Sequence, residues 1–559
     1  MKKILSVLLC AVMLLGCCSF AGFAAQDDFT LIVASDLHYD STNSSRPITK
    51  KNNMSEDFAH AYSGGQLHAE SLAIIDAFFA EGAPLGDCIL LPGDLIVRGD
   101  TEEHTLFAAM LKGYEEKYGK PIYVVPGNHD YYKVTVDEFK ALYADFGYSE
   151  ALEKDTLTAS YTADLGGDYR LIVIDSCIPG KNEAGVTKEL VEWIKQQGEK
   201  AKKDEKFLVA SMHHNLDEHF PLDNDIHEGA VVDKNLGLLE VLAEAGIKYI
   251  FTGHSHEHDI LACTAKDGEV IYDVVTGSLT MAPCPYRVVS FGNEVTFKTN
   301  KVSKVNTALV PEGMSENAFE LLENDFQDYA KQYSFVGLKS LLTSYTSAST
   351  LKGMFDTDSI DDPEVKAIFD GVAEKLAECF DVSIYLKNET NGISIERLLA
   401  KFEVSLPETD YNTLLEILTA IYMQHICGDE DIPIYSDEIL IFSRGLAASL
   451  SYATSDLTDE DYAMVLSYIG KKLDIKTPDI FTDYVASELR RYQGSELLVS
   501  TSIVPLIISY ANDTYPNDSN VTLPGYTQLV EPERELSFLE RISEFFRKIF
   551  DFFMSLFSF

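Results

Sequence analysis

Five short segments in the first half of the chain contain the residues that could do chemistry. In chain order they are Ser35-Asp36-Leu37-His38, Gly93-Asp94, Gly127-Asn128-His129-Asp130, Met212-His213-His214-Asn215 and Gly253-His254-Ser255-His256. They supply carboxylates, an amide oxygen and imidazoles, a ligand set that suits divalent cations such as Mn, Fe or Zn. The segments contain no cysteine, which argues against a structural zinc site.

The spacing within two of these segments favours ligands that act in pairs. In Asp36-x-His38 and His254-x-His256, alternate residues of an extended segment point to the same side. Both members of a pair can then address one ion, or two ions about 3.5–4 Å apart. Asp94 is suited to bridge two cations because a carboxylate has two oxygens.

The strands that precede these segments must position them. Apolar runs predict buried strands at residues 31–34, 88–91, 122–125, 171–174, 207–210, 249–251 and 271–275. Helices are predicted between the strands at 69–80, 102–118 and 188–197. This alternation predicts an α/β layered domain over residues 26–305. Ligands of such sheets lie at the carboxyl ends of the strands.

The second half of the chain has a different pattern. Helix-periodic runs at 318–333, 365–380, 411–426, 438–453 and 459–473 predict an all-α region over residues 306–511. A polar linker is expected at 512–537. Residues 538–559 predict an amphipathic helix with an aromatic face. This helix would dock on the all-α region, or contact a membrane surface or a partner.

The N-terminus is typical of a secretory signal peptide. Lys2 and Lys3 precede an apolar run at residues 4–15, and small residues follow up to Ala25. Residues 14–17 resemble a bacterial lipobox, which would attach a lipid to Cys17, whereas residues 22–24 would suit ordinary cleavage. We therefore expect a signal peptide over residues 1–25. The protein would be bacterial and either secreted or attached to the cell surface.

The composition limits the ligands and the covalent framework. With 45 Lys+Arg against 89 Asp+Glu, the formal net charge of -44 argues against binding of nucleic acid polymers. A small phosphate ester can still bind where divalent cations reverse the local charge. The six cysteines beyond the leader are scattered, and a Cys263–Cys284 disulfide is one conceivable pairing.

The ordered set of segments resembles the calcineurin-like metallophosphoesterase superfamily, whose pattern is D-x-H, GD, GNH, H and GHxH. Every part occurs in order between residues 29 and 300. The likeness is greatest to the branch of cyclic-nucleotide phosphodiesterase-like and other bacterial phosphodiesterases. The resemblance implies a layered β-sandwich flanked by helices. It also implies two metal sites, formed by Asp36, His38 and His256 and by Asn128, His213 and His254, with Asp94 bridging them.

One ligand is chosen between two neighbours. His213 is preferred to His214 because the ligand of this family comes first in a His-His-Pro or His-Ser-Pro turn, although Asn215 replaces the proline here.

The resemblance also implies a reaction. A hydroxide that bridges two divalent metals would attack phosphorus, and His129 would contact the phosphate or protonate the leaving group. Asp130 would orient His129. Small phosphate esters are the expected substrates, with phosphodiesters favoured over phosphomonoesters. The alternative is a catalytically retired surface binding or scaffold protein on the same fold.

Other polar residues near the segments have structural and functional interpretations. Arg98 is expected to form a salt bridge in its loop rather than to clamp phosphate. For His214, contact with the substrate or with a ligand remains open. We expect the pair His258 and Asp259 to orient a metal-binding imidazole. Two further sets complete the expectations: Tyr131 and Tyr132 at the mouth of the site, and His60, His68 and His104 as ordinary surface or helix residues.

Overall fold

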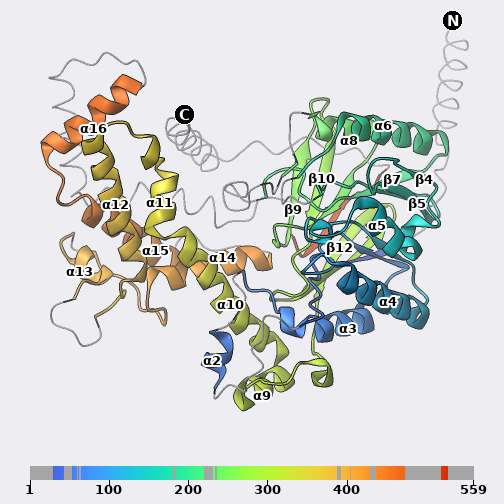
Figure 1. Ribbon diagram of the computed structural model, residues 1–559, viewed down its shortest axis with the longest axis horizontal. Helices are drawn as coiled ribbons and strands as arrows, with labels where there is room; N and C mark the ends of the chain where they lie inside the picture. Colours follow the sequence, from blue (N-terminus) through green and yellow to red (C-terminus); the bar gives the residue numbers. More distant parts are fainter. Residues whose placement is uncertain are drawn as a thin grey trace, which may run out of the picture.

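The chain forms a region of β-sheets with covering helices and a separate region of helices (Figure 1). The computed structural model describes residues 29–42, 53–59, 61, 64–179, 184–219, 229, 231–232, 236–386, 392–402, 404–428, 436–472 and 518–526. The predicted signal peptide with Cys17, His60 and the predicted helix at 538–559 lie outside the described residues.

Two β-sheets form the first region. One sheet has six strands in the order β13-β12-β11-β1-β2-β3, and the other has seven in the order β4-β5-β6-β7-β8-β10-β9. The six-stranded sheet consists of β1 Phe29–Val33, β2 Cys88–Leu91, β3 Ile122–Val124, β11 Pro285–Phe291, β12 Glu294–Lys301 and β13 Asn520–Pro524. The seven-stranded sheet consists of β4 Glu153–Lys154, β5 Tyr161–Gly166, β6 Tyr169–Val173, β7 Phe207–Ser211, β8 Tyr249–Thr252, β9 Asp259–Thr264 and β10 Val270–Val275.

Strand β6 shows how residue alternation produces the layers. Leu171 and Val173 belong to the large core that includes residues of both sheets, whereas Ile172 and Ile174 belong to a second core. The second core also contains Leu190 of α6 and other residues of α6 and α8. Because successive side chains of a strand point to opposite faces, one apolar run supplies both layers. The predicted β-sandwich flanked by helices is therefore confirmed.

Helices cover the sheets at the places that the periodicity predicts. The helices of this region are α3 Ser71–Gly82, α4 Thr101–Tyr118, α5 Val136–Leu142, α6 Lys188–Lys203 and α8 Leu238–Ala245. Helix α2 Met54–Phe58 lies instead beside the helical region (Figure 1), where Asp57 accepts from the Ser315 amide and the Phe58 ring lies against that of Tyr329. Helix α4 begins at Asp100, whose side chain accepts a hydrogen bond from the Glu103 amide, and it ends at Gly119 in the left-handed conformation. Such caps satisfy the terminal amide and carbonyl groups of a helix.

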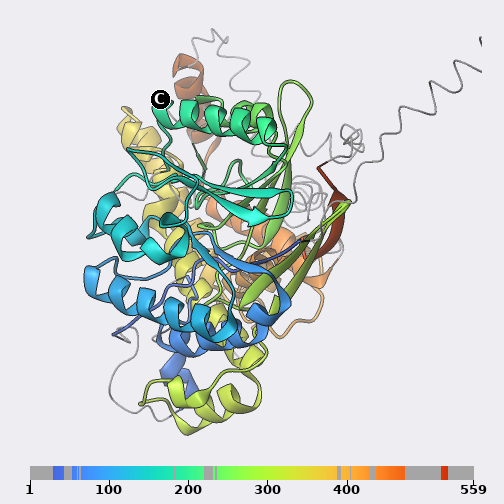
Figure 2. The same cartoon turned by 90° about the vertical axis from the view of Figure 1, so that its right-hand side faces the viewer.

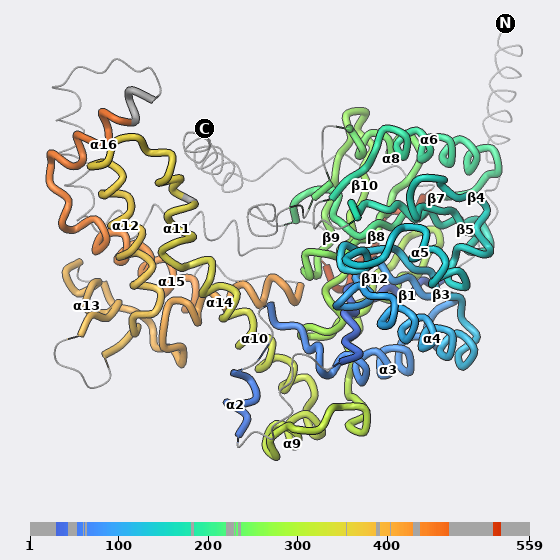
Figure 3. The backbone as a smooth tube through the Cα atoms, viewed as in Figure 1, coloured from blue at the N-terminus to red at the C-terminus, as the bar shows by residue number. Residues whose placement is uncertain are grey.

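The helical region follows β12. Its helices are α9 Glu316–Asn324, α10 Phe326–Tyr345, α11 Ala348–Met354, α12 Pro363–Asp381, α13 Ile395–Ala400, α14 Leu414–Cys427, α15 Asp437–Ala453 and α16 Asp459–Lys472. The helix expected at 318–333 is divided at Asp325, because this side chain caps the start of α10. The tube shows α10 and α14 extending from the helical region toward the sheets (Figure 3).

One predicted boundary is wrong. The linker expected at 512–537 includes β13, which pairs antiparallel with β12 from Asn520 opposite Lys298 to Pro524 opposite Glu294. Figure 2 shows this strand, coloured red, along the edge of its sheet. Tyr526 continues the attachment, since its hydroxyl donates to the Leu208 carbonyl at 2.6 Å. A polar composition with Asn, Thr and Pro is compatible with an edge strand, and the sequence pattern does not separate the two.

The cysteines and the helix lengths give two further results. Cys263 and Cys284 are both buried and are not joined to each other, so the disulfide considered from the sequence is not formed. Within the part of the chain that the structure describes, no helix combines the length and the apolar character needed to cross a membrane.

Candidate metal centre

The five segments come together at the carboxyl ends of neighbouring strands. Strands β1, β2 and β3 run parallel in one sheet, and β7 and β8 run parallel in the other. Backbone hydrogen bonds then join the loops: the His38 amide donates to the Asp94 carbonyl at 3.0 Å, and the Gly253 amide donates to the His213 carbonyl at 2.9 Å. The His254 amide also donates to Asp36 Oδ2 at 3.1 Å, so the loops of the two sheets lie beside one another.

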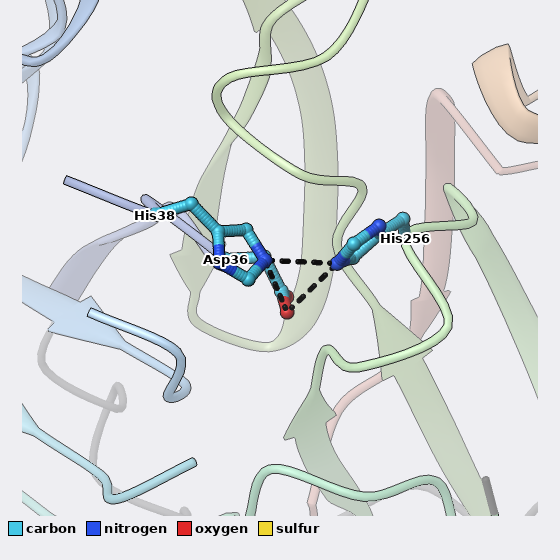
Figure 4. A group of neighbouring side chains, drawn as sticks. All are labelled: Asp36, His38 and His256. Carbon is cyan, nitrogen blue, oxygen red and sulfur yellow. Dashed lines mark hydrogen bonds and ion pairs between the residues drawn. The ribbon is translucent and has the colours of Figure 1, made fainter. Parts of the chain in front are cut away.

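The first ligand group consists of Asp36, His38 and His256 (Figure 4). The Nε2 atoms of His38 and His256 are 3.1 Å apart. Asp36 Oδ1 lies 3.4 Å from Nε2 of His256 and 3.9 Å from Nε2 of His38. All three side chains therefore direct a donor atom toward one point.

The second ligand group consists of Asn128, His213 and His254. Asn128 Oδ1 lies 3.1 Å from His213 Nε2 and 3.0 Å from His254 Nδ1. The two ring nitrogens are 3.2 Å apart. Asn128 and His213 are buried. The amide oxygen and both imidazoles can thus serve as ligands of one cation.

Asp94 lies between the two groups. Its Oδ1 is 3.4 Å from His213 Nε2, and its Oδ2 is 3.9 Å from His38 Nε2. Oδ2 is also 3.9 Å from Nε2 of His129. Each carboxylate oxygen therefore faces a different ligand group, as a bridging ligand requires.

The residues present fit two divalent cations. Three overlapping groups of Asp and His side chains have ligand atoms within 4.8 Å of one another, and Asp94 belongs to two of these groups. Imidazoles and carboxylates converging in a buried place suit Mn, Fe or Zn. In each ligand group, two imidazole nitrogens face each other at hydrogen-bond distance. Without a cation, the two nitrogens of such a pair could share only one proton between them.

Charge coupling is strong around the bridging carboxylate. Burial alone would raise the pKa of Asp94, but the charges of His213 and His129 hold it well below its usual range. Burial likewise opposes protonation of His213, and Asp94 nevertheless raises the pKa of this histidine to about 9. Burial lowers the pKa of His38, and the neighbouring charge of His129 adds to this effect. The site therefore keeps Asp94 ionised and ready to bind positive charge.

Five of the predicted ligands have a backbone conformation that side chains rarely adopt. The φ angles are positive at Asp36 (51°), His38 (43°), Asp94 (47°), His254 (70°) and His256 (64°). Non-glycine residues in this region cost on the order of 1–3 kcal/mol each and persist where the surrounding structure fixes them. The pairs Asp36-x-His38 and His254-x-His256 do address common points, but in this strained conformation rather than in the extended one assumed from their spacing.

Two glycines of the motifs are required by close approach. A Cβ atom at Gly127 would overlap with the backbone and carboxylate of Asp94. A Cβ atom at Gly253 would overlap with Ser35 Oγ and Asp36 Oδ2. The glycines therefore allow the ligand loops to reach the distances described above.

His129 lies at the edge of the centre, in the short helix η3 His129–Tyr131. Its side chain is 22% exposed, and its Nδ1 donates to the Val97 carbonyl at 3.1 Å. Its Nε2 is thereby left to face Asp94 and the space that a substrate would occupy. The expectation that Asp130 orients this ring is wrong: Asp130 accepts hydrogen bonds from the amides of Leu95 and Gly127 instead. Asp130 thus joins two ligand loops.

Arg98 has the structural role expected of it. Its Nε lies 3.2 Å from Glu103 Oε1, its Nη1 lies 3.6 Å from Asp100 Oδ2, and its Nη2 donates to Ser41 Oγ. These contacts tie the loop that follows Asp94 to the start of α4.

His214 is turned away from the ligand point of His213. Its Nδ1 is 2.9 Å from Ser176 Oγ, and its ring lies 4.4 Å from that of His254 between centroids. It therefore packs against a predicted ligand rather than joining the ligand group.

The expectation for His258 and Asp259 finds no support in the described contacts, and His68 and His104, expected as ordinary surface or helix residues, lie in helices but are buried. His258 contacts Thr299 and the Gly277 amide, and Asp259 contacts His219, so neither is shown to contact a predicted metal-binding imidazole. His68 is buried, with its ring 5.6 Å from that of His38 between centroids. His104 is also buried, and its ring contacts the Tyr143 hydroxyl and the Asp130 carbonyl.

The two tyrosines expected at the mouth of the site lie in different environments. Tyr131 is buried with its hydroxyl donating to Asp175, whereas Tyr132 is 39% exposed with its ring 4.7 Å from that of His129.

Gln66 was not singled out by any motif, yet its Nε2 lies 2.8 Å from His256 Nδ1. It precedes no strand and belongs to no spaced pair, so the sequence pattern contains no signal for it.

Comparisons with known proteins agree with this geometry. The family described as calcineurin-like phosphoesterase matches residues 29–258. A protein of Arcobacter nitrofigilis described as a probable glycerophosphodiester phosphodiesterase, GpdQ, is 29% identical over 131 residues. That alignment covers 23% of this chain and 42% of the relative, so this chain spans less than half of the relative's length.

Solved structures with lower identity are also similar. A dimetal phosphatase from Danio rerio is 12% identical with a TM-score of 0.36, covering 50% of this chain and 98% of that one. A conserved uncharacterized protein from Streptococcus pneumoniae, titled a predicted phosphoesterase, is 14% identical with a TM-score of 0.22, covering 50% and 92%. Residues 29–258, which carry the ordered ligand segments, are thus similar to the calcineurin-like phosphoesterase family.

Proposed function

We propose that the protein is a metal-dependent hydrolase of phosphate esters that uses two divalent cations, Mn, Fe or Zn. The observation that carries this proposal is the position of Asp94, whose two oxygens face two separate groups of ligands. Every ligand that the family pattern requires is in place, which disfavours a catalytically retired scaffold. When bound, the cations would supply the charge that activates water and neutralises the phosphate oxygens.

The chain itself supplies the orientation and a proton. Asp36, His38, Asn128 and His213 are buried, so little water competes for the bound phosphate on this side. His129 is held through Nδ1 by the Val97 carbonyl, and its Nε2 can donate a proton to the departing alkoxide. The attacking water loses a proton to solvent and its oxygen bonds to phosphorus, while the bond from phosphorus to the leaving oxygen breaks and that oxygen takes the proton from His129.

We favour small phosphodiesters over phosphomonoesters as substrates. The relative described as a phosphodiesterase supports this preference. The formal charge of -44 also supports it, because a diester carries less negative charge than a monoester and is repelled less. Tyr132, exposed beside His129, offers an aromatic surface to an organic group of the substrate. Nucleic acid polymers remain outside the proposed substrates for the same electrostatic reason.

The test is hydrolysis of bis-p-nitrophenyl phosphate and p-nitrophenyl phosphate by protein without residues 1–25. Each assay contains Mn²⁺, Fe²⁺ or Zn²⁺ after removal of other metals. We expect metal-dependent turnover with a higher kcat/KM for the diester. A higher kcat/KM for the monoester would reverse the substrate preference, and no turnover with any of the metals would contradict the proposal as a whole.

We also propose an extracytoplasmic location, on the basis of the leader sequence. Lys2, Lys3 and the apolar run at 4–15 support export, and Cys17 supports attachment through a lipid as one of two routes. Expression of the full chain in a bacterium, followed by mass spectrometry of the mature N-terminus, would distinguish a lipidated Cys17 from cleavage near Ala25. A retained Met1 in the cytoplasmic fraction would contradict export. The amphipathic segment at 538–559 is proposed as a second contact with the membrane surface.

A further inference from the structure

His256 has its second ring nitrogen held by a side chain outside the five segments. Its Nε2 faces His38 and Asp36, as described above, and its Nδ1 lies 2.8 Å from the side-chain amide of Gln66. Gln66 is only 5% exposed. The imidazole is therefore fixed at both nitrogens, with the metal point on one side and a buried amide on the other.

The chemistry of the ring defines what this amide must do. When Nε2 of His256 binds a cation, Nδ1 keeps its proton and needs an acceptor. The acceptor of Gln66 is Oε1, which has no hydrogen-bond partner among the described residues. A half-turn of the amide brings Oε1 to the position of Nε2, because the two atoms are nearly equivalent in shape. Gln66 is thus suited to accept from His256 and to fix the direction of its ring.

The helical region holds the segment that carries Gln66. Ser334 of α10 donates through Oγ to the Gly65 carbonyl at 2.8 Å and accepts from the Ala282 amide at 3.1 Å. A Cβ atom at Gly65 would meet the Ser334 carbonyl oxygen at 2.9 Å, so the two backbones are in close contact. On its other side, the segment is attached to the region of the two β-sheets by the Leu67 amide, which donates to the Thr280 carbonyl.

A second helix contacts the residue that follows His256. Nε2 of His425, in α14, lies 3.1 Å from Oε1 of Glu257, and both side chains are buried. At the end of α14, a Cβ atom at Gly428 would meet the carbonyl oxygen of His258 in close contact. The loop that carries His256 is therefore enclosed by α14 on one side and by the Gln66 segment on the other. Helix α10 packs behind the Gln66 segment.

We propose that the helical region completes the metal centre, with Gln66 as the positioning residue that orients His256 and with α10 and α14 holding Gln66 and the His256 loop in place. This inference rests on the proposed function insofar as His256 must bind a cation. It assigns the helical region a part in metal binding that neither the motifs nor the family match, which ends at residue 258, provides. Outer partners of metal-binding histidines typically contribute a factor of about 10–100 in metal affinity.

The experiment measures binding of Mn²⁺ to metal-free protein by isothermal titration calorimetry and by electron paramagnetic resonance. Wild type is expected to bind two ions. In Gln66→Leu, affinity for one ion should fall about 10–100-fold while the other ion binds as before. Gln66→Glu should restore much of the affinity, because its carboxylate accepts from His256 Nδ1. The matched control is Gln197→Leu, which removes an equally buried glutamine from α6 and should leave both isotherms unchanged.

A second variant tests the part of the helices. Ser334→Ala removes one link between α10 and the Gly65 carbonyl and should weaken the same ion about fivefold, the effect of one hydrogen bond. Its control is Ser443→Ala, which removes a buried hydroxyl that donates within α15. The inference is overturned if both ions bind to folded Gln66→Leu and Ser334→Ala as tightly as to wild type. Failure of wild type to bind Mn²⁺, Fe²⁺ or Zn²⁺ would instead contradict the proposed function.

Discussion

In the helical region, each of the helices α9 to α15 begins with a side chain that accepts a hydrogen bond from its own first turn. The capping residues are Ser315, Asp325, Ser347, Asp362, Ser394, Thr413 and Ser436. Helices α4, α5 and α6 of the sheet region have the same kind of cap, but the polar side chains of the metal centre make contacts across long stretches of sequence. Asp36 and His254, for example, are joined through the His254 amide although 218 residues separate them.

The difference concerns where the polar groups find their partners. A cap is satisfied within three residues, so its effect is local and adds to helix stability with little dependence on the rest of the chain. The metal centre instead concentrates buried carboxylates and imidazoles from five loops, in strained backbone conformations. A bound cation would compensate the buried carboxylates of such a centre. Substitutions in the two regions should therefore separate loss of function from loss of stability.

The largest effect is expected for Asp94→Asn. An amide oxygen is neutral and cannot bridge two cations as a carboxylate does, so kcat/KM for bis-p-nitrophenyl phosphate should fall more than about 100-fold, beyond the effect of an outer partner. Circular dichroism should show unchanged helix content. The control is Asp145→Asn, an exposed aspartate on the surface. Wild-type turnover of folded Asp94→Asn at the same metal concentration would remove the basis of the proposed site.

Metal removal should act mainly on the loops that carry the ligands. Each bound Mn²⁺ at about 100 times its Kd should stabilise the folded state by about 2.7 kcal/mol relative to protein with a chelator. Hydrogen exchange should show the gain of protection in the loops after β2, β3 and β8, and less in α11 and α12. Asp94→Asn should lose this stabilisation. Protection that rises equally in α11 and α12 would show that the two regions respond to the metal as one unit.

A smaller effect is expected at the edge of the centre. Tyr132→Ala removes the exposed aromatic ring beside His129, and an aromatic contact contributes about 0.5–1.5 kcal/mol. KM for bis-p-nitrophenyl phosphate should therefore rise several-fold, with kcat changing less. Tyr132→Phe keeps the ring and serves as the control. If Tyr132→Ala and wild type have the same KM for the aryl diester, this ring is not part of the substrate surface.

The smallest functional effect is expected for Ser436→Ala in the helical region. Loss of this cap at the start of α15 should lower the free energy of unfolding by about 1 kcal/mol. Turnover by the folded protein should be unchanged, because Ser436 contacts only its own helix in the hydrogen bonds described. Denaturant unfolding and steady-state kinetics on the same sample provide the comparison. A large loss of turnover at constant stability would contradict the division between local caps and long-range ligands.

Much of the fold could be predicted because it depends on periodicity. The apolar runs of β1, β2 and β8 and the helical period of α12 and α15 lead directly to buried strands and helices. The strand β13 could not be predicted, because an edge strand of five residues with a polar composition has the same local pattern as a linker. The division at Asp325 was missed for a related reason: its capping effect competes with a periodicity that continues on both sides.

The sequence by itself indicated which residues are candidate metal ligands: the types, order and spacing of Asp36, His38, Asp94 and the later segments favour divalent cations. Only the tertiary structure decided how those atoms are held. The positive φ angles, the Val97 carbonyl behind His129 and the Gln66 amide behind His256 depend on chain segments far apart in sequence. The physical reason is that a ligand's identity is a property of one residue, whereas its orientation is set by whatever packs behind it.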